Sequence, residues 1–278
     1  ENKASDLTKD EIIRLMVGRK LDAKDLNPES YERDEVLLEV KNLTGKYKPT
    51  VSDVSFDLKK GEVLGIAGLV GSRRTELVET IFGLRQKESG EIYVSGKKVE
   101  NRNPEEAIEN GFALVTEERR ATGIFPYASI RFNSTIANLR EYAKKGFVNE
   151  KALKDSTTKV IDSMSVKTPS QHTKIMNLSG GNQQKVIIGR WLLTDPDILL
   201  LDEPTRGIDV GAKYEIYKLI QDLATTGKSV IFISSEMAEL QMICNRIMVM
   251  SNGKVAGIEE NNKDLNQEKI MALQAMYV

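Results

Sequence analysis

Residues 178–209 read LSGGNQQKVIIGRWLLTDPDILLLDEPTRGID, and two neighbouring features of this stretch predict both architecture and chemistry. The first starts at Ser179, where a serine and two glycines precede helix-spaced apolar residues that continue to Leu192. A helix that begins there points its unpaired N–H groups and the positive end of its dipole outward, which suits a bound anion. Considered alone, these residues favour an ordinary serine-capped helix after a glycine turn.

The second feature is an unbroken apolar run at residues 198–201, which ends in two carboxylates, Asp202 and Glu203. Such a run is typical of a strand buried on both faces, and open α/β sheets bind ligands at the carboxyl ends of these strands. Asp202 is then placed to hold a magnesium ion, and Glu203 to orient or deprotonate a water molecule. On these two residues alone, a strand that ends in ordinary polar residues remains the alternative.

The order of these features is more specific than either feature alone. An LSGGNQQK segment, a helix, a buried strand, DEPT and then Gly207-Ile208-Asp209 resemble the signature, Walker B and D-loop series of ATP-binding-cassette ATPases. The resemblance extends from about Val36 to the C-terminus. It implies an α/β fold of the P-loop NTPase type, in which an ABC-type ATPase core carries an antiparallel β subdomain and an α-helical subdomain.

Composition sets wider limits on the function. The chain has 278 residues, with 40 lysines and arginines against 41 aspartates and glutamates. This balance provides no electrostatic footprint for nucleic acid or for an anionic membrane. The single cysteine, Cys244, excludes an internal disulfide framework and fits a reducing compartment.

The N-terminal residues indicate a linker. No apolar run reaches the roughly 18 to 20 residues that span a bilayer, and no signal-peptide pattern is present, so we expect a soluble, cytoplasmic protein. The chain begins at Glu1 without a methionine, on a polar stretch followed by apolar residues at 12–17, which suggests the tail of a preceding domain. The pattern at residues 1–35 indicates a helical piece and a charged linker. The resemblance implies that this segment joins two cassettes and that residues 36–278 form one cassette.

A second phosphate-binding element lies nearer the N-terminus. An apolar strand leads into residues 68–75, GLVGSRRT, and helix-spaced residues follow; this order of strand, glycine loop and helix holds phosphates. Gly68 and Thr75 match the pattern G-x-x-x-x-G-K-[ST]. The strict pattern nevertheless fails, because Arg73 stands at the second glycine and Arg74 at the lysine.

These two arginines change the expected chemistry. Arg74 can neutralise phosphate, but its planar guanidinium is bulkier than an ammonium group. Arg73 adds a side chain where the backbone approaches the phosphates, whereas Thr75 remains able to ligate magnesium. We expect nucleotide binding that is weakened or altered in geometry; a loop that has lost nucleotide binding remains the alternative.

Two further positions depart from the family pattern. The family usually has a glutamine at Glu117 and a histidine at Ser235. A carboxylate at Glu117 adds negative charge near the acids at 202–203, so either its pKa rises or a cation compensates. Alternatively, Glu117 turns outward and pairs with Arg119 or Arg120, an interaction that is worth little at a surface.

The remaining pattern predicts the two subdomains. Alternation of apolar and polar residues between 36 and 94 suits an antiparallel sheet with one solvated face. In the family this sheet supports the adenine, usually through a stacked aromatic, and Tyr47 is the candidate. Residues 121–176 look mainly helical, with helices at 130–144 and 151–164. They resemble the helical subdomain that faces the membrane partner.

The resemblance assigns roles to individual residues of this chain. The catalytic candidates are Glu203, Glu117 and Ser235, and the magnesium ligands are Thr75, Asp202 and Glu117. The residues assigned to nucleotide binding are Gly68, Gly71, Ser72, Arg73, Arg74, Thr75, Glu76, Tyr47, Ser179, Gly180, Gly181, Gln183 and Asp209.

The combination of LSGGNQQK, GLVGSRRT, DEPTRGID and FISSEM is similar to the C-terminal cassette of bacterial monosaccharide importers. In that family two cassettes meet head to tail, and each ATP lies between one phosphate loop and the other signature. The resemblance implies an ATPase with Mg²⁺ and ATP as cofactors, which energises uptake of a sugar such as galactose or methyl galactoside. This cassette would complete its partner's site while its own site is slow.

The same resemblance implies the partners. They are the N-terminal cassette of the same polypeptide, membrane permease subunits and, indirectly, a sugar-binding protein, at the cytoplasmic face of the bacterial cell membrane. Two other functions remain open: a nucleotide-binding regulatory half that never hydrolyses, and a soluble cassette ATPase acting on ribosomes or DNA. The charge balance and the short helical segment argue against the last, and we expect no nucleic-acid partner.

Overall fold

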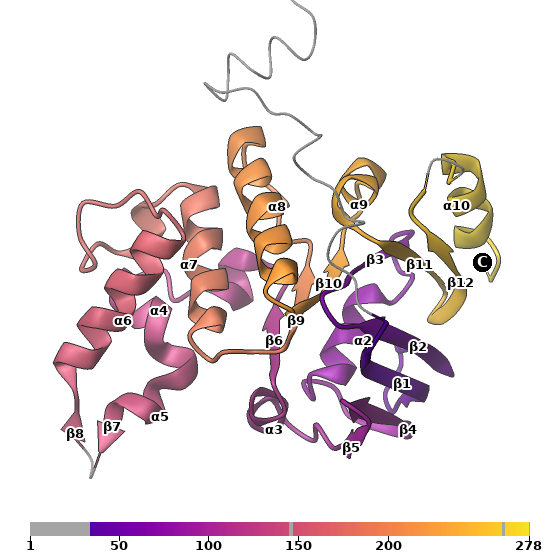
Figure 1. Cartoon of the computed structure of the whole chain (residues 1–278), viewed down its shortest axis with the longest axis horizontal. Helices are drawn as coiled ribbons and strands as arrows, with labels where there is room; N and C mark the ends of the chain where they lie inside the picture. Colours follow the sequence, from indigo (N-terminus) through magenta and orange to yellow (C-terminus); the bar gives the residue numbers. More distant parts are fainter. Residues whose placement is uncertain (1–33, 145–146, 263–264, 278) are drawn as a thin grey trace, which may run out of the picture.

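The computed structural model describes residues 34–144, 147–262 and 265–277. The expected linker at 1–35 lies almost entirely outside these described residues. A six-stranded sheet in the order β12-β11-β3-β10-β9-β6 occupies the centre of the molecule (Figure 1). Its strands are β3 (Val63–Gly68), β6 (Phe112–Val115), β9 (Ile198–Asp202), β10 (Ser229–Ile233), β11 (Arg246–Ser251) and β12 (Lys254–Glu260).

The continuous apolar runs become the parallel part of this sheet. Every residue of β9 and β10 is buried, as expected for strands covered on both faces. β10 pairs in parallel with both β9 and β3, and Ile233 lies in register with Asp202 on one side and with Ile66 on the other. The carboxyl ends of these three strands therefore meet at one edge of the sheet.

Helices cover the two faces of the sheet and bury alternate residues of its strands. One core contains Leu199 and Leu201 of β9 with residues of α7 (Gly180–Leu192), α8 (Val210–Thr225) and α9 (Met237–Ile243). The other contains Leu200 with residues of α2 (Arg74–Ile81) and α3 (Pro104–Glu109). α10 (Gln267–Gln274) contributes Ile270 to the first core.

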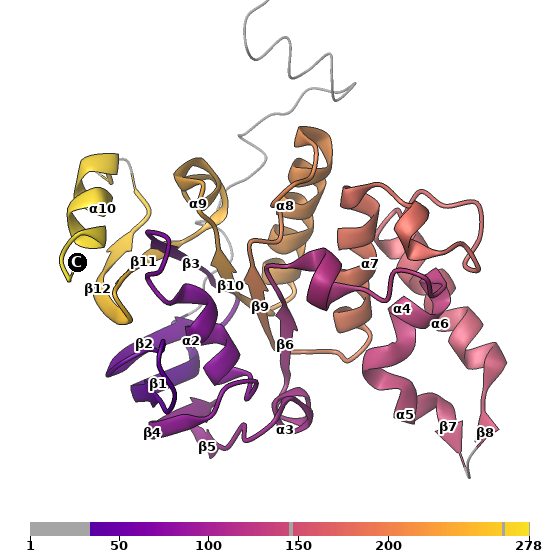
Figure 2. The same cartoon turned by 180° about the vertical axis from the view of Figure 1, so that it is seen from behind.

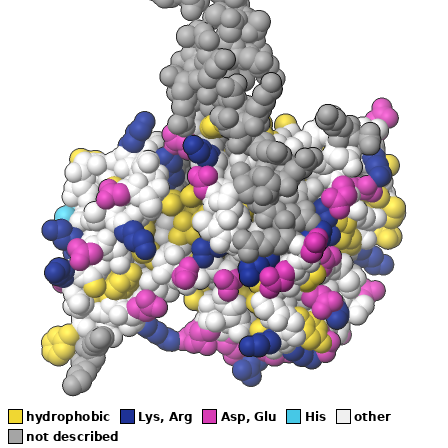
Figure 3. Space-filling view, in the orientation of Figure 1, with side chains coloured by type: hydrophobic (Ala, Val, Ile, Leu, Met, Phe, Trp, Pro, Cys, Tyr) yellow, Lys and Arg dark blue, Asp and Glu magenta, His cyan; other side chains and the backbone are white. Residues whose placement is uncertain are grey.

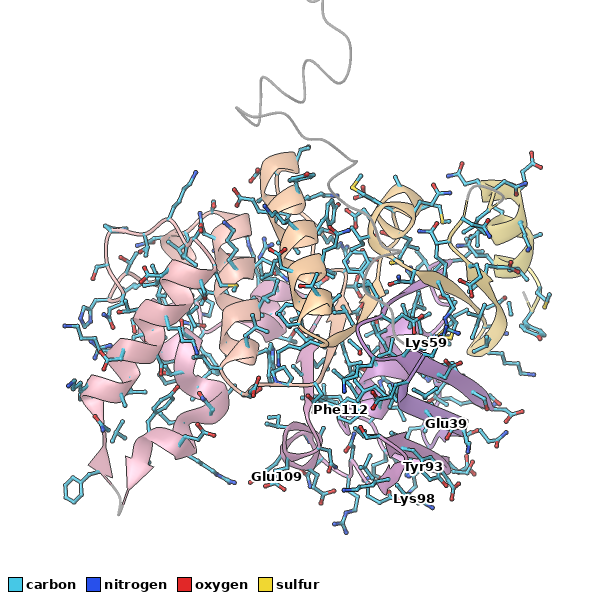
Figure 4. The ribbon with its side chains drawn as sticks, viewed as in Figure 1. Glu39, Lys59, Tyr93, Lys98, Glu109 and Phe112 are labelled. Atoms are coloured by element: carbon cyan, nitrogen blue, oxygen red, sulfur yellow. The ribbon has the colours of Figure 1, made fainter. Side chains whose placement is uncertain are left out.

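A separate antiparallel sheet in the order β2-β1-β4-β5 packs against the second core. It consists of β1 (Val36–Gly45), β2 (Val54–Lys59), β4 (Lys87–Val94) and β5 (Lys97–Val99). Glu39, Tyr93 and Lys98 are successive partners across three of its strands, and Figure 4 shows them along this sheet. The predicted α/β fold with an antiparallel β subdomain is confirmed.

The helical region lies on the other side of β6 and β9 from α2, as Figures 1 and 2 show in opposite views. It contains a π-helix η4 (Arg119–Gly123), α4 (Ile130–Thr135), a 3₁₀ turn η5 (Ile136–Asn138), α5 (Leu139–Tyr142), the hairpin β7 (Ala143–Lys144) and β8 (Phe147–Val148), α6 (Glu150–Ser163) and a 3₁₀ turn η6 (Ile175–Asn177). None of the helices in the described residues is long and apolar enough to cross a membrane.

One helix predicted in this region is not continuous in the structure. The sequence predicts a single helix at 130–144, whereas the structure breaks it into α4, η5, α5 and β7. Polar side chains near the break take backbone partners: Thr135 Oγ1 donates to Arg131 O at 2.8 Å, and Asn138 Nδ2 donates to Leu193 O at 3.1 Å. Such bonds compete with a regular helix, and helical spacing alone does not reveal them.

Candidate functional site

The loop between β3 and α2 forms one side of the candidate site. A Cβ atom on Gly68 would lie 2.3 Å from Ser72 Oγ and 2.8 Å from Met250 O, so only glycine fits at this close approach. Ser72 is buried, and its hydroxyl has no hydrogen-bond partner among the described residues. Gly71 has a φ of 85°, which a side chain would disfavour. The loop therefore has the tight backbone path expected of a phosphate-binding turn.

Arg73 occupies a left-handed backbone position, with φ 76°, immediately before α2. Its Nη1 atom lies 3.2 Å from Glu76 Oε1 in the first turn of that helix. Arg73 also lines a cavity of about 590 Å³ together with residues that flank Tyr47, including Lys46 and Lys48. Tyr47 itself is 62% exposed, and its ring lies 5.3 Å from Lys46 Nζ. The phosphate loop and the Tyr47 segment thus border one hollow.

Arg74 turns toward the end of β10 and the acids of β9. Its Nη1 atom donates to Ser234 O at 3.1 Å, and its Nη2 atom lies 3.8 Å from Glu203 Oε1. Both side chains of this ion pair are largely shielded from solvent. The guanidinium therefore joins the phosphate loop to both neighbouring strand ends.

The Thr75 hydroxyl donates to Asp202 Oδ2 at 2.7 Å. Asp202 is 1% exposed, and its Oδ1 atom has no hydrogen-bond partner among the described residues. Burial raises the pKa of Asp202 to about 7; the Thr75 hydrogen bond opposes this rise, and the nearby Glu117 and Glu203 carboxylates add to it. A cation would relieve this charge, since a hydroxyl and a carboxylate oxygen are ligands that Mg²⁺ accepts.

Mg²⁺ often keeps water and nucleotide oxygens as its other ligands, so it needs few protein groups. The residues present at the Thr75 and Asp202 pair therefore fit magnesium held jointly with a nucleotide.

Glu203 follows Asp202 in a left-handed conformation, with φ 46°, which is uncommon for a residue with a side chain. Its N–H donates to Ile233 O at 3.0 Å, and Ser235 Oγ donates to Glu203 Oε2 at 3.3 Å. Burial raises the pKa of Glu203, whereas the positive charge of Arg74 lowers it. Glu203 and Ser235 were both singled out in the sequence, and the fold brings them into contact.

Glu117 interacts with a cation that the sequence did not suggest. Arg206 Nη1 forms a hydrogen bond and ion pair with Glu117, and it also lies 3.7 Å from Glu118 Oε1. Among the described residues, Glu117 forms its ion pair with Arg206 and not with Arg119 or Arg120, the partners considered from sequence. Arg206 directly follows the DEPT segment, so its position was visible but its contact depends on the fold.

A second cavity of about 590 Å³ opens beside these acids. Its walls include Thr75, Glu117 and Asp202, together with Arg85 and Glu79 of the α2 region. Arg85 pairs with Glu79 at 2.5 Å, so this end of the cavity is also polar. The candidate metal ligands therefore face open space next to the phosphate loop.

The signature residues lie at the start of α7. Ser179 caps this helix, and its Oγ atom accepts from Asn182 Nδ2 at 2.9 Å. A Cβ on Gly181 would come within 2.4 Å of the Ala212 side chain, so glycine permits α7 to pack closely on α8. Asp209 in turn caps α8 by accepting from Ala212 N at 2.9 Å. The signature and D-loop residues therefore pack together where α7 and α8 begin, and this region is called the signature corner below.

Gln183 points into the protein. It is buried, and its Nε2 atom donates to Ile175 O at 3.2 Å and to Leu178 O at 3.1 Å. Within this chain the amide supports the loop before Ser179. Figures 1 and 2 show that α7 and α2 lie on opposite sides of β6 and β9. The residues assigned to nucleotide binding therefore form two groups, one beside the phosphate loop and one at the signature.

Comparison with known proteins identifies the family and the fold. The family model described as "ABC transporter" matches residues 51–206. Solved ATP-binding cassettes share the fold: one bound to ADP and Pi in a post-hydrolysis state has a TM-score of 0.70, 23% identity and covers 81% of this chain and 99% of its own. A nucleotide-free cassette has a TM-score of 0.75, 20% identity and covers 87% of this chain and 99% of its own.

Curated relatives are much closer in sequence. The galactose/methyl galactoside import ATP-binding protein MglA of Fusobacterium nucleatum is 58% identical over 278 residues, which are 100% of this chain and 55% of that protein. The protein of the same name from Escherichia coli K12 is 58% identical over 273 residues, 98% of this chain and 54% of that protein. The chain thus spans about half the length of these relatives. The predicted ATPase class is confirmed, because the chain belongs to the ABC transporter family.

Proposed function

We propose that the chain is the second ATP-binding cassette of an importer for a monosaccharide such as galactose or methyl galactoside. Its relatives carry that import function in their names, and they are about twice as long as this chain. The observation that carries the proposal is an asymmetry between the two groups of residues. The departures from the family pattern all surround the phosphate loop, whereas the signature corner at Ser179 follows the pattern.

The cassette's own site is proposed to bind MgATP. Thr75 and Asp202 would hold Mg²⁺, and the first N–H groups of α2 would meet the phosphates, aided by the charge of Arg74. The cavity beside Tyr47 is wide enough, at about 590 Å³, for a base and ribose. Bound magnesium would supply positive charge at the phosphates, which also explains why a carboxyl as buried as Asp202 is present.

Turnover at this site is proposed to be slow. Arg74 is engaged with Ser234 O and Glu203, so its guanidinium is only partly available to a phosphate. Glu117 places a carboxylate, paired with Arg206, where the family pattern has a neutral glutamine. Losing a positioned catalytic group commonly costs about 10²- to 10⁴-fold in rate, so these departures together are enough to silence a site.

The signature corner is proposed to act on the other cassette. Ser179, Gly180 and Gly181 would meet the γ-phosphate bound by the N-terminal cassette of the same polypeptide, and Asp209 would approach from the neighbouring helix. Within residues 36–278, the helical subdomain at about 121–176 would face the permease subunits at the cytoplasmic side of the membrane. A sugar-binding protein would contact only the permease.

Hydrolysis by the reconstituted full importer tests this proposal. Ser179→Arg places a bulky cation at the signature, and we expect the ATPase rate to fall about 10²-fold or more. Thr225→Arg is the matched control, because Thr225 is an exposed residue at the end of α8, outside the helical subdomain, and its substitution should leave the rate unchanged. An unchanged rate in Ser179→Arg would show that this signature does not serve a hydrolysing site.

Two alternatives are separated by other measurements. A regulatory half that only binds nucleotide predicts no rate loss for Ser179→Arg but a changed response of the transporter to nucleotide. A cassette acting on ribosomes or DNA predicts salt-dependent RNA or DNA binding. Figure 3 shows acidic and basic side chains interspersed over one face of the molecule, which disfavours such a surface there.

A further inference from the structure

Glu239 of α9 is a buried carboxylate with four hydrogen-bond donors. The residue is only 4% exposed. Thr205 Oγ1 and Ser234 Oγ each donate to Oε2 at 2.7 Å. Lys213 Nζ and Tyr217 Oη each donate to Oε1 at 2.7 Å. Each carboxylate oxygen of Glu239 therefore accepts two hydrogen bonds.

Two of these donors belong to the loops that carry the candidate catalytic residues. Thr205 lies two residues after Glu203, on the loop that follows β9. Ser234 precedes Ser235 on the loop that follows β10, and its carbonyl accepts the hydrogen bond from Arg74. Oε2 of Glu239 therefore links the loop after β9 to the loop after β10. Arg74, next to the phosphate loop, bonds to the second of these loops.

The other two donors belong to α8. Lys213 and Tyr217 lie one and two turns after Asp209, the residue that caps this helix. Lys213 also reaches Glu236 at 2.6 Å. α8 packs closely on the signature helix at Gly181, as described above. The second oxygen of Glu239 therefore joins the catalytic loops to the helix that carries the D-loop and supports the signature.

The network keeps Glu239 ionised. Burial alone raises the pKa of this carboxyl, but the hydrogen bonds from Lys213, Tyr217, Thr205 and Ser234 outweigh it and hold the pKa below its usual value. A charged acceptor makes stronger hydrogen bonds than a neutral one. The four donors are consequently held at one point, and loss of the acceptor would leave buried polar groups without a partner.

We infer that Glu239 is a positioning residue of this cassette: it holds the loops of Glu203 and Ser235 in fixed relation to α8. If nucleotide binding moves Glu203, Ser235 and Arg74, this network would thereby shift Asp209 and the signature corner as well. The inference deepens the proposed function, on which it rests. None of the four donors to Glu239 is among the residues assigned to nucleotide or magnesium binding.

Two substitutions at Glu239 have different consequences. Glu239→Ala removes the acceptor for all four donors. Glu239→Gln can keep its oxygen toward Lys213 and Tyr217 while its NH₂ group faces Thr205 and Ser234, whose hydroxyls can turn to accept. We therefore expect the glutamine variant to restore most of what the alanine variant loses.

Hydrogen exchange of the full-length chain provides a local readout. The amides of Glu203 and Arg206 bond to Ile233 O and Glu203 O, and the amide of Glu236 bonds to Ser234 Oγ. Glu239→Ala is expected to speed exchange at these three amides at least about tenfold, and Glu239→Gln to leave them within about threefold of wild type. MgATP should slow their exchange in the wild type and not in the alanine variant.

Glu62→Gln is the matched control. Glu62 is also a fully buried carboxylate, and it receives Arg246 Nε at 2.7 Å, but it lies at the junction of β2, β3 and β11. Its substitution is expected to lower thermal stability while leaving exchange at the three reporter amides unchanged. In the reconstituted importer, Glu239→Ala should lower kcat about tenfold per folded molecule, and Glu62→Gln should not.

Several outcomes would overturn the inference. Equal exchange at the reporter amides in Glu239→Ala and Glu62→Gln would show that Glu239 acts only on general stability. Failure of Glu239→Gln to restore local exchange would show that charge, not loop positioning, matters. If Glu239→Ala does not fold, Thr205→Val with Ser234→Ala provides the second variant and must loosen the same amides. Hydrogen exchange does not depend on which cassette hydrolyses ATP, so failure of the proposed function, measured with Ser179→Arg, is distinguished from failure of this inference.

Discussion

Thr75 and Asp202 are joined by a 2.7 Å hydrogen bond although 127 positions separate them in the chain. The bond links the first turn of α2 to the end of β9, and it leaves the other Asp202 oxygen without a partner among the described residues. Both residues match the family pattern without change. The pair therefore offers the most direct test of magnesium binding.

Thr75→Val removes the hydroxyl while preserving shape. We expect the affinity for a fluorescent ATP analogue at this site to fall about tenfold in the presence of Mg²⁺ and to change little in the presence of a chelator. Thr80→Val is the control, because Thr80 is a buried threonine of the same helix whose hydroxyl donates to Glu76 O at 2.6 Å. Similar losses in both variants would argue against a metal-binding role.

Asp202→Asn tests the effect of burial on the carboxyl. The folded pKa of Asp202 is raised to about 7, above its ordinary value of 3.8, so the folded state binds the extra proton between these values. Stability contributed by that proton is present at about pH 4 and is lost as the pH rises through 7. Without metal, Asp202→Asn should therefore melt a few degrees above wild type at pH 8 and no higher near pH 4.

Differential scanning calorimetry with a chelator present measures this difference. Addition of MgATP should reverse the order at pH 8, because only the wild-type carboxylate binds the metal strongly. A higher melting temperature for wild type at pH 8 without metal would contradict the assigned burial cost of Asp202.

Glu203→Gln tests turnover at this cassette's own site. The side chain is restrained by Ser235 and faces Arg74, and we expect the ATPase rate of the reconstituted importer to stay within about twofold of wild type. Loss of a working general base would instead cost about 10²- to 10⁴-fold. A collapse of the rate would mean that Arg74, Glu117 and Ser235 support catalysis in this cassette.

Arg73→Gly restores the glycine of the family pattern. Because Arg73 has φ 76°, glycine should relieve backbone strain and raise the free energy of unfolding by about 1 kcal/mol, while removing a side chain from the nucleotide cavity. Urea unfolding and titration with an ATP analogue measure the two effects. Ser95→Gly is the control, because Ser95 has φ 49° in a turn between β4 and β5 and should change stability but not nucleotide binding.

The fold class was accessible from sequence because its signals are local. Buried parallel strands leave continuous apolar runs such as 198–201, and antiparallel strands with one wet face leave alternation such as that of β2. The phosphate loop and the signature also consist of consecutive residues, so their order indicated the family. The helix predicted at 130–144 was interrupted because Thr135 and Asn138 bond to backbone groups that helical periodicity does not report.

By itself, the sequence determined the buried parallel strands, the glycine-containing loops before α2 and α7, and the family to which the chain belongs, because each depends on residues within one short segment. Only the tertiary structure determined the pairing of Glu117 with Arg206, the inward position of Gln183 and the four-donor network of Glu239. These contacts join segments from different strands and helices. Their geometry depends on the parallel register of β3, β9 and β10, which no local pattern specifies.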